Sequence, residues 1–506
     1  MKNIYVRAGM SPFESFTADK ILLDNSIGTN VGNFLYLFGT LRNLVQEDTI
    51  VTPSYYKLSY SREEIDRINQ ECDCFLIPLA DAFRPDFRSE LRALTRLVEQ
   101  LTIPCVVTGV GLCAPYNAEP DQSYPFDEDA KAFVKAVLNK SAKIGVRGEI
   151  TSAYLSHLGF REGTDHTPIG CPSLYMNGPK LQIREANITP DSFVCYNTTL
   201  TTPDKVHEFV HRSLAQFHDT HFVPQVRPEL KLMYLGAPYI CDANPLYPTR
   251  ITDPVYSGDQ TRFFLNVPTW IEYMKGADFC FGTRLHGNVS AMLAGTPSIL
   301  LAKDARVREL AEYHDMTRFP TEQITEKTDI WDLIAKADFH QAEKRHYANY
   351  THFIDFLEEN HLSPHRQAPD HMEELPFERR MKDVKLEPPV TSIAICGMEE
   401  MARRFEAYWP QQERRIKNLD TDGKALKKEK KELQSEKKKL QEEQKKLQEE
   451  KTGLQVKNKS LEKEQKRLQA ELDKPLLILI GKRIEKKWPK IGKGLRKVKK
   501  AFFHRK

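Results

Sequence analysis

An arginine and a histidine, Arg284 and His286, lie two residues apart in a short polar turn between apolar segments. The run from Phe279 to Asp304 reads FCFGTRLHGNVSAMLAGTPSILLAKD. Arginine presents a planar fork of donors that fits phosphate or carboxylate, and histidine carries a proton that moves near neutral pH. A surface turn can carry both residues merely for capping, but this combination favours a site that binds an anion and transfers a proton.

The apolar residues around this turn predict the elements that hold it. Phe279–Phe281 is typical of a buried strand, Asn288–Leu293 of a helix, and Ser298–Ala302 of a second buried strand. Strand, turn, helix and strand make half of a doubly wound sheet, which binds ligands at the carboxyl ends of its strands. The helix start at Gly287 and Asn288 would add free N–H groups to an anion site.

Apolar strands alternate with helical patterns twice along the chain. In the first run the expected strands are Cys74–Leu79, Cys105–Val110 and Lys143–Val146, and the expected helices are Phe87–Leu101 and Phe126–Lys140. From about residue 191 the pattern restarts with strands at Phe193–Tyr196 and His221–Gln225 and helices at Asp204–Phe217 and Trp270–Lys275. This alternation predicts two Rossmann-like halves. Arg147 directly follows its strand, so it offers a second cationic anchor.

The chain resembles the polysaccharide pyruvyl transferase family over residues from about 20 to 360. The most specific match is the Gly-Thr-Arg-Leu-His-Gly turn at 282–287. Weaker matches follow the family's order, at Ile27–Asn33, Ile103–Gly111, Ile144–Tyr154, Ile169–Ser173, Ala294–Pro297 and Asp304–Leu310. The resemblance implies an α/β fold in which two Rossmann-like halves face a cleft, the GT-B-like architecture.

The resemblance also implies a reaction. Pyruvyl would pass from phosphoenolpyruvate to a sugar diol of a polysaccharide or lipid-linked glycan, giving a pyruvate ketal and phosphate, with no metal and no cofactor beyond this co-substrate. His286 suits the general acid, because a bound phosphate would favour its protonated form. Arg284, Arg147, Gly287 and Asn288 would hold the donor. Arg306 could line the cleft or form a surface ion pair, and His166 and His221 both remain candidates for the general base.

Two other functions fit parts of the same pattern. A GT-B glycosyltransferase that uses a nucleotide sugar would share the fold and the anion site, although no carboxylate for a nucleotide ribose can be placed in the sequence. A membrane-tethered scaffold without catalysis would keep the fold, but the intact Arg284–Gly287 turn argues against it.

Length and charge divide the 506 residues into five expected parts. These are an N-terminal half (1–165), a C-terminal half (166–360), a proline-rich linker with a short helical piece around Met398–Tyr408 (361–423), a coiled coil (424–472) and a basic amphipathic tail (473–506). The net charge of the chain is +4, but residues 1–423 carry −13, because the last two parts are strongly basic. Nine scattered cysteines predict reduced thiols in a cytoplasmic protein rather than a disulfide framework.

Leucine recurs at every seventh position through the expected coiled coil. The series is Leu426, Leu433, Leu440, Leu447, Leu454, Leu461 and Leu468. The matching a positions are polar, so the seam would be weak, and a solvated single helix supported by Glu–Lys pairs remains the alternative to self-association. In either state the 49 residues span about 70 Å as a helix.

The last 32 residues carry twelve Lys or Arg and one Glu. An apolar run, Leu476–Ile480, precedes a stripe at Ile491, Leu495, Val498 and Phe502. This basic amphipathic pattern favours a peripheral position on the anionic, cytoplasmic face of a membrane. Binding to nucleic acid would need only the basic residues, so it is not expected, and a solvated disordered tail is the remaining alternative.

Overall fold

The first half of the chain builds a parallel sheet. The computed structural model describes residues 2–119, 122–239, 241–472, 476–489 and 491. The strands of this half are β1 (Asn3–Val6), β2 (Ile50–Pro53), β3 (Cys74–Pro78), β4 (Cys105–Thr108), β5 (Ile144–Val146) and β6 (His166–Pro168). Strand β6 lies just past the expected boundary at residue 165, but it pairs with β5 and so belongs to this half. The order is β2-β1-β3-β4, with β5 and β6 as a separate parallel pair joined to the end of β4 by the bridge between Val110 and Val146.

The second half repeats this plan with a five-stranded parallel sheet. Its strands are β7 (Phe193–Asn197), β8 (Asp219–Phe222), β9 (Phe279–Gly282), β10 (Ser298–Ala302) and β11 (Arg318–Pro320), in the order β11-β10-β9-β7-β8. The sequence-based prediction of two Rossmann-like α/β halves is therefore confirmed. The predicted strand at His221–Gln225 lies earlier than expected, because β8 pairs with β7 from Asp219 to Phe222.

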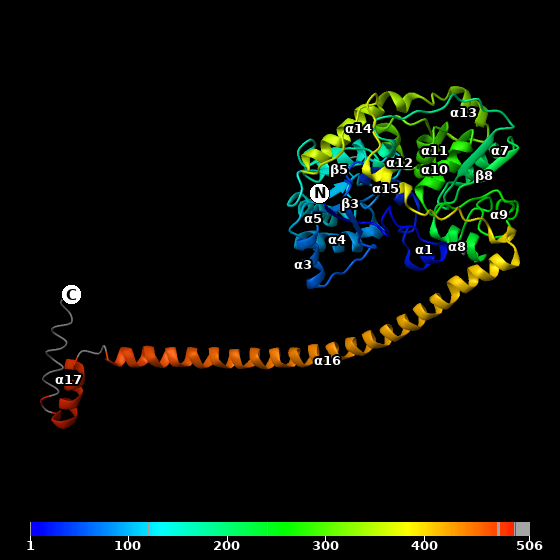
Figure 1. Ribbon diagram of the computed structural model, residues 1–506. Helices are drawn as coiled ribbons and strands as arrows, with labels where there is room; N and C mark the ends of the chain where they lie inside the picture. The colour runs from blue at the N-terminus through cyan, green and yellow to red at the C-terminus, as the bar shows by residue number, and fades with distance from the viewer. Residues whose placement is uncertain (1, 120–121, 240, 473–475, 490, 492–506) are drawn as a thin grey trace. The chain divides into compact units, whose positions relative to one another are not determined.

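Helices connect the strands and cover both sheets (Figure 1). In the first half they are α1 (Ala18–Asp24), α2 (Gly32–Arg42), α3 (Arg62–Glu71), α4 (Arg88–Gln100), α5 (Asp127–Leu138) and α6 (Glu149–His157). In the second they are α7 (Asp204–Leu214), α8 (Arg227–Leu235), α9 (Pro254–Ser257), α10 (Val267–Gly276), α11 (Leu285–Leu293), α12 (Ala305–Tyr313), α13 (Ile330–Lys336) and α14 (Gln341–Glu359). Local sequence explains several boundaries: α3, for example, begins with a capping box between Ser61 and Glu64.

Helix α11 begins three residues before the predicted start. Arg284 is its N-cap residue, and the backbone N–H of Arg284 donates to the side chain of Asn197 at the end of β7, at 2.8 Å. The helix therefore starts at Leu285, and His286 lies in its first turn. This places Arg284 and His286 at the carboxyl end of the central strand β9.

Helix α2 links the two halves of the core. Almost all of its residues are buried, and it packs against the 3-10 turn Pro172–Asn177 and against α11 of the second half. A Cβ at Gly39 would lie 1.9 Å from the carbonyl oxygen of Pro172, so only glycine permits this approach. The first residue of the helix, Gly32, lies against the ring of His286.

Residues 361–412 belong to the same compact unit as the two halves, which comprises residues 1–412. Helix α15 (Pro376–Lys382) is held to α2 by a bond from the nearly buried Arg42 Nε to Glu378, at 2.8 Å. Val390 bridges to Phe263, and Arg404, in the first turns of α16 (Met398–Leu472), donates to the carbonyl oxygen of Thr391 at 3.1 Å. The expected helical piece at Met398–Tyr408 is the start of α16.

The second unit comprises residues 413–506. It contains the rest of α16, which is continuous to Leu472, and α17 (Leu476–Lys487), which includes the apolar run Leu476–Ile480. Of the predicted amphipathic stripe, Ile491 is described and exposed, whereas Leu495, Val498 and Phe502 lie outside the described residues. None of the described helices combines the length and apolar character needed to cross a membrane.

Candidate functional site

A cavity of about 750 Å³ lies where the carboxyl ends of both sheets meet. Its lining includes residues that follow five different strands: Arg7 after β1, Asp81 after β3, Arg147 after β5, Arg284 after β9 and Lys303 after β10. Parallel strands bring such residues to one edge, and two facing sheets bring the two edges together. Four of the predicted site residues thus share one cavity: Arg147, Arg284, His286 and Arg306.

Positive charge dominates this cavity. Among the described residues, seven Arg and Lys side chains line it and only two carboxylates, Asp81 and Glu90. The basic residues are Arg7, Lys57, Arg84, Arg147, Arg284, Lys303 and Arg306. Such a lining favours a polyanionic ligand. In the described part of the chain, no group of three or more His, Cys, Asp or Glu side chains is placed to hold a metal ion.

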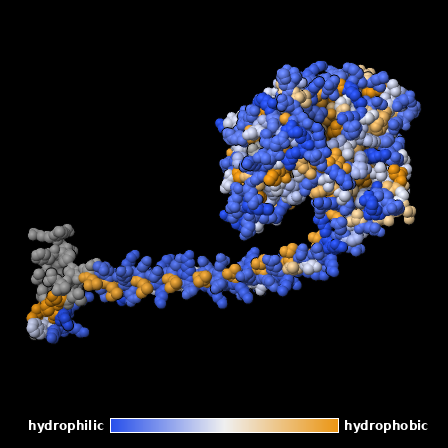
Figure 2. Space-filling view, viewed as in Figure 1, coloured by the Kyte–Doolittle hydropathy of each residue, from blue (hydrophilic) through white to orange (hydrophobic). Residues whose placement is uncertain are grey.

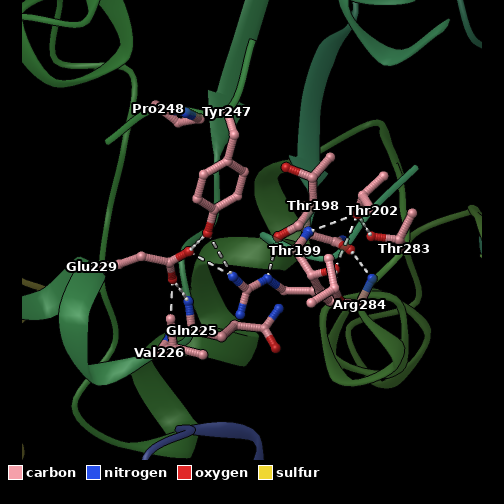
Figure 3. A network of polar contacts seen from close by, with 12 residues as sticks. Thr198, Thr199, Thr202, Gln225, Val226, Glu229, Tyr247, Pro248, Thr283 and Arg284 are labelled. Carbon is pink, nitrogen blue, oxygen red and sulfur yellow. Dashed lines mark hydrogen bonds and ion pairs between the residues drawn. The ribbon is translucent and has the colours of Figure 1, made fainter. Parts of the chain in front are cut away.

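Arg284 is fixed by a buried network (Figure 3). Its Nη2 lies 2.5 Å from Oε1 of the fully buried Glu229, and it also donates to the hydroxyl of Tyr247 at 3.1 Å. Its Nε donates to the carbonyl oxygen of Thr198. Burial alone would lower the pKa of Arg284, but Glu229 and Tyr247 raise that pKa above its ordinary value. One edge of the guanidinium is therefore committed to the protein.

Arg147 is an incompletely paired cation of the site. Only 2% of the residue is exposed, and its Nε donates to the carbonyl oxygen of Gly109 at 3.1 Å. Its buried Nη2 has no hydrogen-bond partner among the described residues. An unpaired buried donor on a charged group is costly, so such a group calls for an anionic partner from outside the protein. Arg147 lines the cavity, where a bound anion would reach it.

The surroundings of His286 favour its uncharged form. Burial, followed by the charges of Arg147 and Arg306, lowers the pKa of His286 to about 3. Its Nε2 lies 3.8 Å from Sγ of Cys171, and Gly32 leaves room for the ring on the other side. The sequence-based expectation of a protonated histidine can therefore apply only when an anion offsets the two arginines.

Arg306 lines the cavity and is also ion-paired. It bonds to Asp81 and lies 3.4 Å from Asp304, and the pairing of Asp81 with two arginines, Arg306 and Arg84, lowers the pKa of Asp81 to about 2 against the effect of burial. The sequence left two roles open for Arg306, cleft residue and ion pair, and the structure shows that Arg306 has both.

Sequence reasoning missed Lys303, which directly follows β10. Its Nζ donates to the hydroxyls of Thr199 and Thr201, both at 2.7 Å, and burial lowers its pKa to about 8. Lys303 follows a buried strand as directly as Arg147 does, so the same positional signal was available. Asp81 and Arg7 also follow strands, but β1 was not recognised as a strand.

Several candidate residues do not line the cavity. Gly287 and Asn288 lie in α11 and are not part of the cavity lining. The buried Asn288 amide donates to the carbonyl oxygens of Gly282 and Arg284. His166 lies in β6 against Ser152, and His221 lies in β8 against Tyr273. The structure therefore places neither histidine where it could act as the general base.

Several solved structures align with the chain at low sequence identity. An uncharacterised protein from Klebsiella pneumoniae subsp. pneumoniae aligns with 11% identity and a TM-score of 0.34, covering 65% of this chain and 92% of that one. A putative UDP-N-acetylglucosamine 2-epimerase from Listeria monocytogenes aligns with 10% identity and a TM-score of 0.37, covering 72% and 98%. S. aureus MnaA in complex with UDP aligns with 13% identity and a TM-score of 0.30, covering 75% and 95%.

Sequence comparison identifies the family. No curated protein sequence matches the chain. The family model for polysaccharide pyruvyl transferase matches residues 30–304, which is more than half of the chain and includes the turn with Arg284 and His286. The chain therefore belongs to the polysaccharide pyruvyl transferase family and is a transferase.

Proposed function

We propose that this protein transfers pyruvyl from phosphoenolpyruvate to two hydroxyls of a sugar, forming a cyclic ketal and releasing phosphate. The observation that carries the proposal is Arg147, whose buried Nη2 finds no partner in the described part of the chain and lines a cavity dominated by cations. Phosphoenolpyruvate bears a carboxylate and a phosphate, so it needs at least two cationic anchors. Family membership supports pyruvyl as the transferred group.

The donor would bind between the two sheets. Arg147 offers its free Nη2 from the first half, and Lys303 and Arg284 reach the cavity from the second. Because the anchors belong to different halves, one half can hold the phosphate of a donor molecule while the other holds its carboxylate. Such fixed, water-poor cations also stabilise the negative charge that develops on the departing phosphate.

His286 is our candidate for the general acid. An incoming trianion offsets the charges of Arg147 and Arg306, which together with burial hold the pKa of His286 at about 3 in the free protein. The donor thus raises that pKa, and the imidazole takes up a proton. Transfer of this proton to the methylene carbon of the enol phosphate leaves an electrophilic carbon at the centre of the donor.

The remaining steps balance without a further reactant. One sugar hydroxyl bonds to the central carbon and loses its proton, which the neutral imidazole can accept. The carbon–oxygen bond to phosphate then breaks, the second hydroxyl bonds to the same carbon, and its proton leaves with the phosphate. Two hydroxyl protons are lost, one appearing in the new methyl group and one on hydrogen phosphate. The balance requires no cofactor besides phosphoenolpyruvate.

The C-terminal tail favours a glycan carried on a membrane lipid as the acceptor. The net charge of +11 in residues 475–506 would attract anionic lipid, and α17 contains the apolar run Leu476–Ile480. The proposed location is therefore the cytoplasmic face of a membrane, held peripherally, beside a lipid-linked acceptor.

The test is to incubate the purified full-length protein with phosphoenolpyruvate and a panel of sugar lipids. Inorganic phosphate should appear in step with a ketal product detected by mass spectrometry, and Arg147→Met should abolish both. Consumption of nucleotide sugars with no use of phosphoenolpyruvate would establish the glycosyltransferase alternative. A folded protein that uses neither donor would support the scaffold.

A further inference from the structure

The long helix α16 exposes a continuous apolar row within the second unit. The seven leucines of the heptad series remain between 54% and 63% exposed, and Figure 2 shows hydrophobic residues at regular intervals along this helix. The row extends beyond the predicted segment, because Ile416 and Leu419 precede it in the same register and Leu472 follows it. It therefore spans 57 residues, about 85 Å of helix.

We propose that this row is the interface of a parallel, in-register, two-stranded coiled coil formed with a second copy of the chain. The leucines of the series occupy d positions, and Ile416 and Leu472 occupy a positions. Leucine at d with a single Asn and several Lys at a is the pattern that limits assembly to two strands, since a polar a side chain in a dimer can still reach water. The charges beside the seam determine the direction and the register.

In a parallel pair, each g residue faces the e residue that follows it by five positions on the partner. Two such pairs are attractive, Asp422 with Lys427 and Lys457 with Glu462. The remaining pairs join Glu to Gln: 429 with 434, 436 with 441, 443 with 448, 450 with 455, and 464 with 469. No pair in this register is repulsive. The pattern is therefore compatible with parallel pairing along the whole row.

The polar a positions also favour a parallel, in-register pair. In a parallel pair, an a side chain packs into a hole bordered by the preceding g residue of the partner. Each of the three lysines at a, at 430, 437 and 451, follows a glutamate at g. The single basic g residue, Lys457, is followed by the uncharged Asn458. Every lysine in the seam thus has an acidic neighbour on the partner strand.

Other arrangements lose these contacts. An antiparallel pair places g residues against g residues, and seven of the eight g residues are acidic, Lys457 being the exception. A parallel shift by one heptad brings Glu450 against Glu462 and separates the two Asn458 side chains. Opposed like charges and an Asn facing an unlike residue both disfavour these alternatives.

The first experiment measures the mass of the full-length protein by light scattering at micromolar concentration. We expect a dimer, and we expect a monomer when Leu440, Leu447 and Leu454 are all replaced by Ser. The matched control replaces Lys431, Lys438 and Lys445, which face away from the seam, by Ser and should remain dimeric. A monomeric wild-type protein, or a triple Leu variant of unchanged mass, would overturn the proposal.

The second experiment tests direction and register. Lys430→Cys should form a disulfide-linked dimer under mild oxidation, because residue 430 of one chain faces residue 430 of the other only in the parallel, in-register pair. Lys431→Cys, on the outer face, and the wild-type protein are the controls. Cross-linking at 431 equal to that at 430 would contradict the proposed geometry.

A charge exchange provides an independent readout of the same register. Lys457→Glu should weaken the dimer several-fold, since the new carboxylate would then face Glu462 of the other copy, and the double variant with Glu462→Lys should restore it. Residues 457 and 462 lie five apart and do not face each other within one helix, so restoration must act between chains. Failure of the second change to restore the dimer would rule out this pairing.

Discussion

At the scale of single residues, the proposed mechanism requires His286 to gain a proton when the donor binds. Since its pKa is about 3 in the free cavity, His286 is neutral at pH 7. A donor that raises this pKa binds together with a proton at pH values below the pKa of the bound state, so affinity should increase as the pH falls through that pKa. Calorimetric titration in buffers of different ionisation enthalpy should detect this proton uptake.

Replacement of His286 by Gln should lower turnover by about a hundredfold or more, the usual contribution of a positioned acid, and should leave most of the donor affinity. The same change should abolish the proton uptake, which a merely structural role would not. Phosphate release and calorimetry measure the two effects. Near-normal turnover in this variant would remove the histidine from the mechanism.

The two strand-end arginines should respond differently to substitution. Arg284→Met leaves the fully buried Glu229 carboxylate without its cation, which costs about 3–5 kcal/mol of stability. Arg147→Met removes a guanidinium that has no ion pair among the described residues, so the fold should be kept while donor binding is lost. Thermal unfolding and donor titration of both variants make the comparison. Equal losses of stability would contradict these separate roles.

Positions that follow strands could be predicted, but long-range partners could not. Arg147 and Arg284 were found because each ends an apolar run, and the structure brings both to one cavity. Glu229, which fixes Arg284, lies 55 residues away on another helix, and no local pattern connects the two. The depressed pKa of His286 likewise depends on Arg147 and Arg306, whose proximity arises only from folding.

Helix α2 is the element on which the geometry of the site depends. Its packing on the turn Pro172–Asn177 needs glycine at position 39, and its start at Gly32 leaves room for the ring of His286. Residues of both halves line the cavity. Because α2 packs on both halves, it determines the distance between them at the cavity.

Gly39→Ala should therefore destabilise the protein by about 1–3 kcal/mol or more, since the added carbon would lie 1.9 Å from a backbone oxygen. Gly276→Ala is the matched control, because a Cβ at Gly276 meets nothing within 4 Å. Denaturant unfolding of both variants measures the difference. A loss of stability at 276 as large as that at 39 would show that the contact with Pro172 is not the cause.

Strong apolar runs predicted β3, β4, β9 and β10, whereas the weaker patterns of β1 and β2 were missed. β1 and β2 are short and were not recognised, and α11 begins earlier than its helix-forming residues suggested, because Asn197 binds the N–H of Arg284. That bond joins segments 87 residues apart, so the helix boundary was not encoded locally.

At the scale of the whole molecule, the chain divides its charge between acidic and basic parts. Residues 1–423 are net acidic, and the residues that follow are net basic. The heptad repeat was evident in the sequence because it is strictly local, and the helix follows it through Leu472. The partner of its leucines is a separate molecule, so the fold of one chain cannot show it.

The basic tail should direct the protein to anionic membranes. The full-length protein should co-sediment with anionic vesicles, and a chain that ends at Asp473 should not, because about 1 kcal/mol is gained for each basic residue near the surface. High salt should remove most of the binding and leave a small fraction that depends on apolar insertion. Equal binding by both chains, or binding to nucleic acid and not to vesicles, would contradict this role.

The exposed leucine row has a consequence for how firmly the protein stays on a surface. In a parallel pair, both tails leave the rod at the same end, so once one tail touches a bilayer the other is present at an effective concentration in the millimolar range. Retention then depends on avidity, and a tail too weak to hold a single chain can hold two. Dilution that separates the rods would release the enzyme without any change in the tail itself.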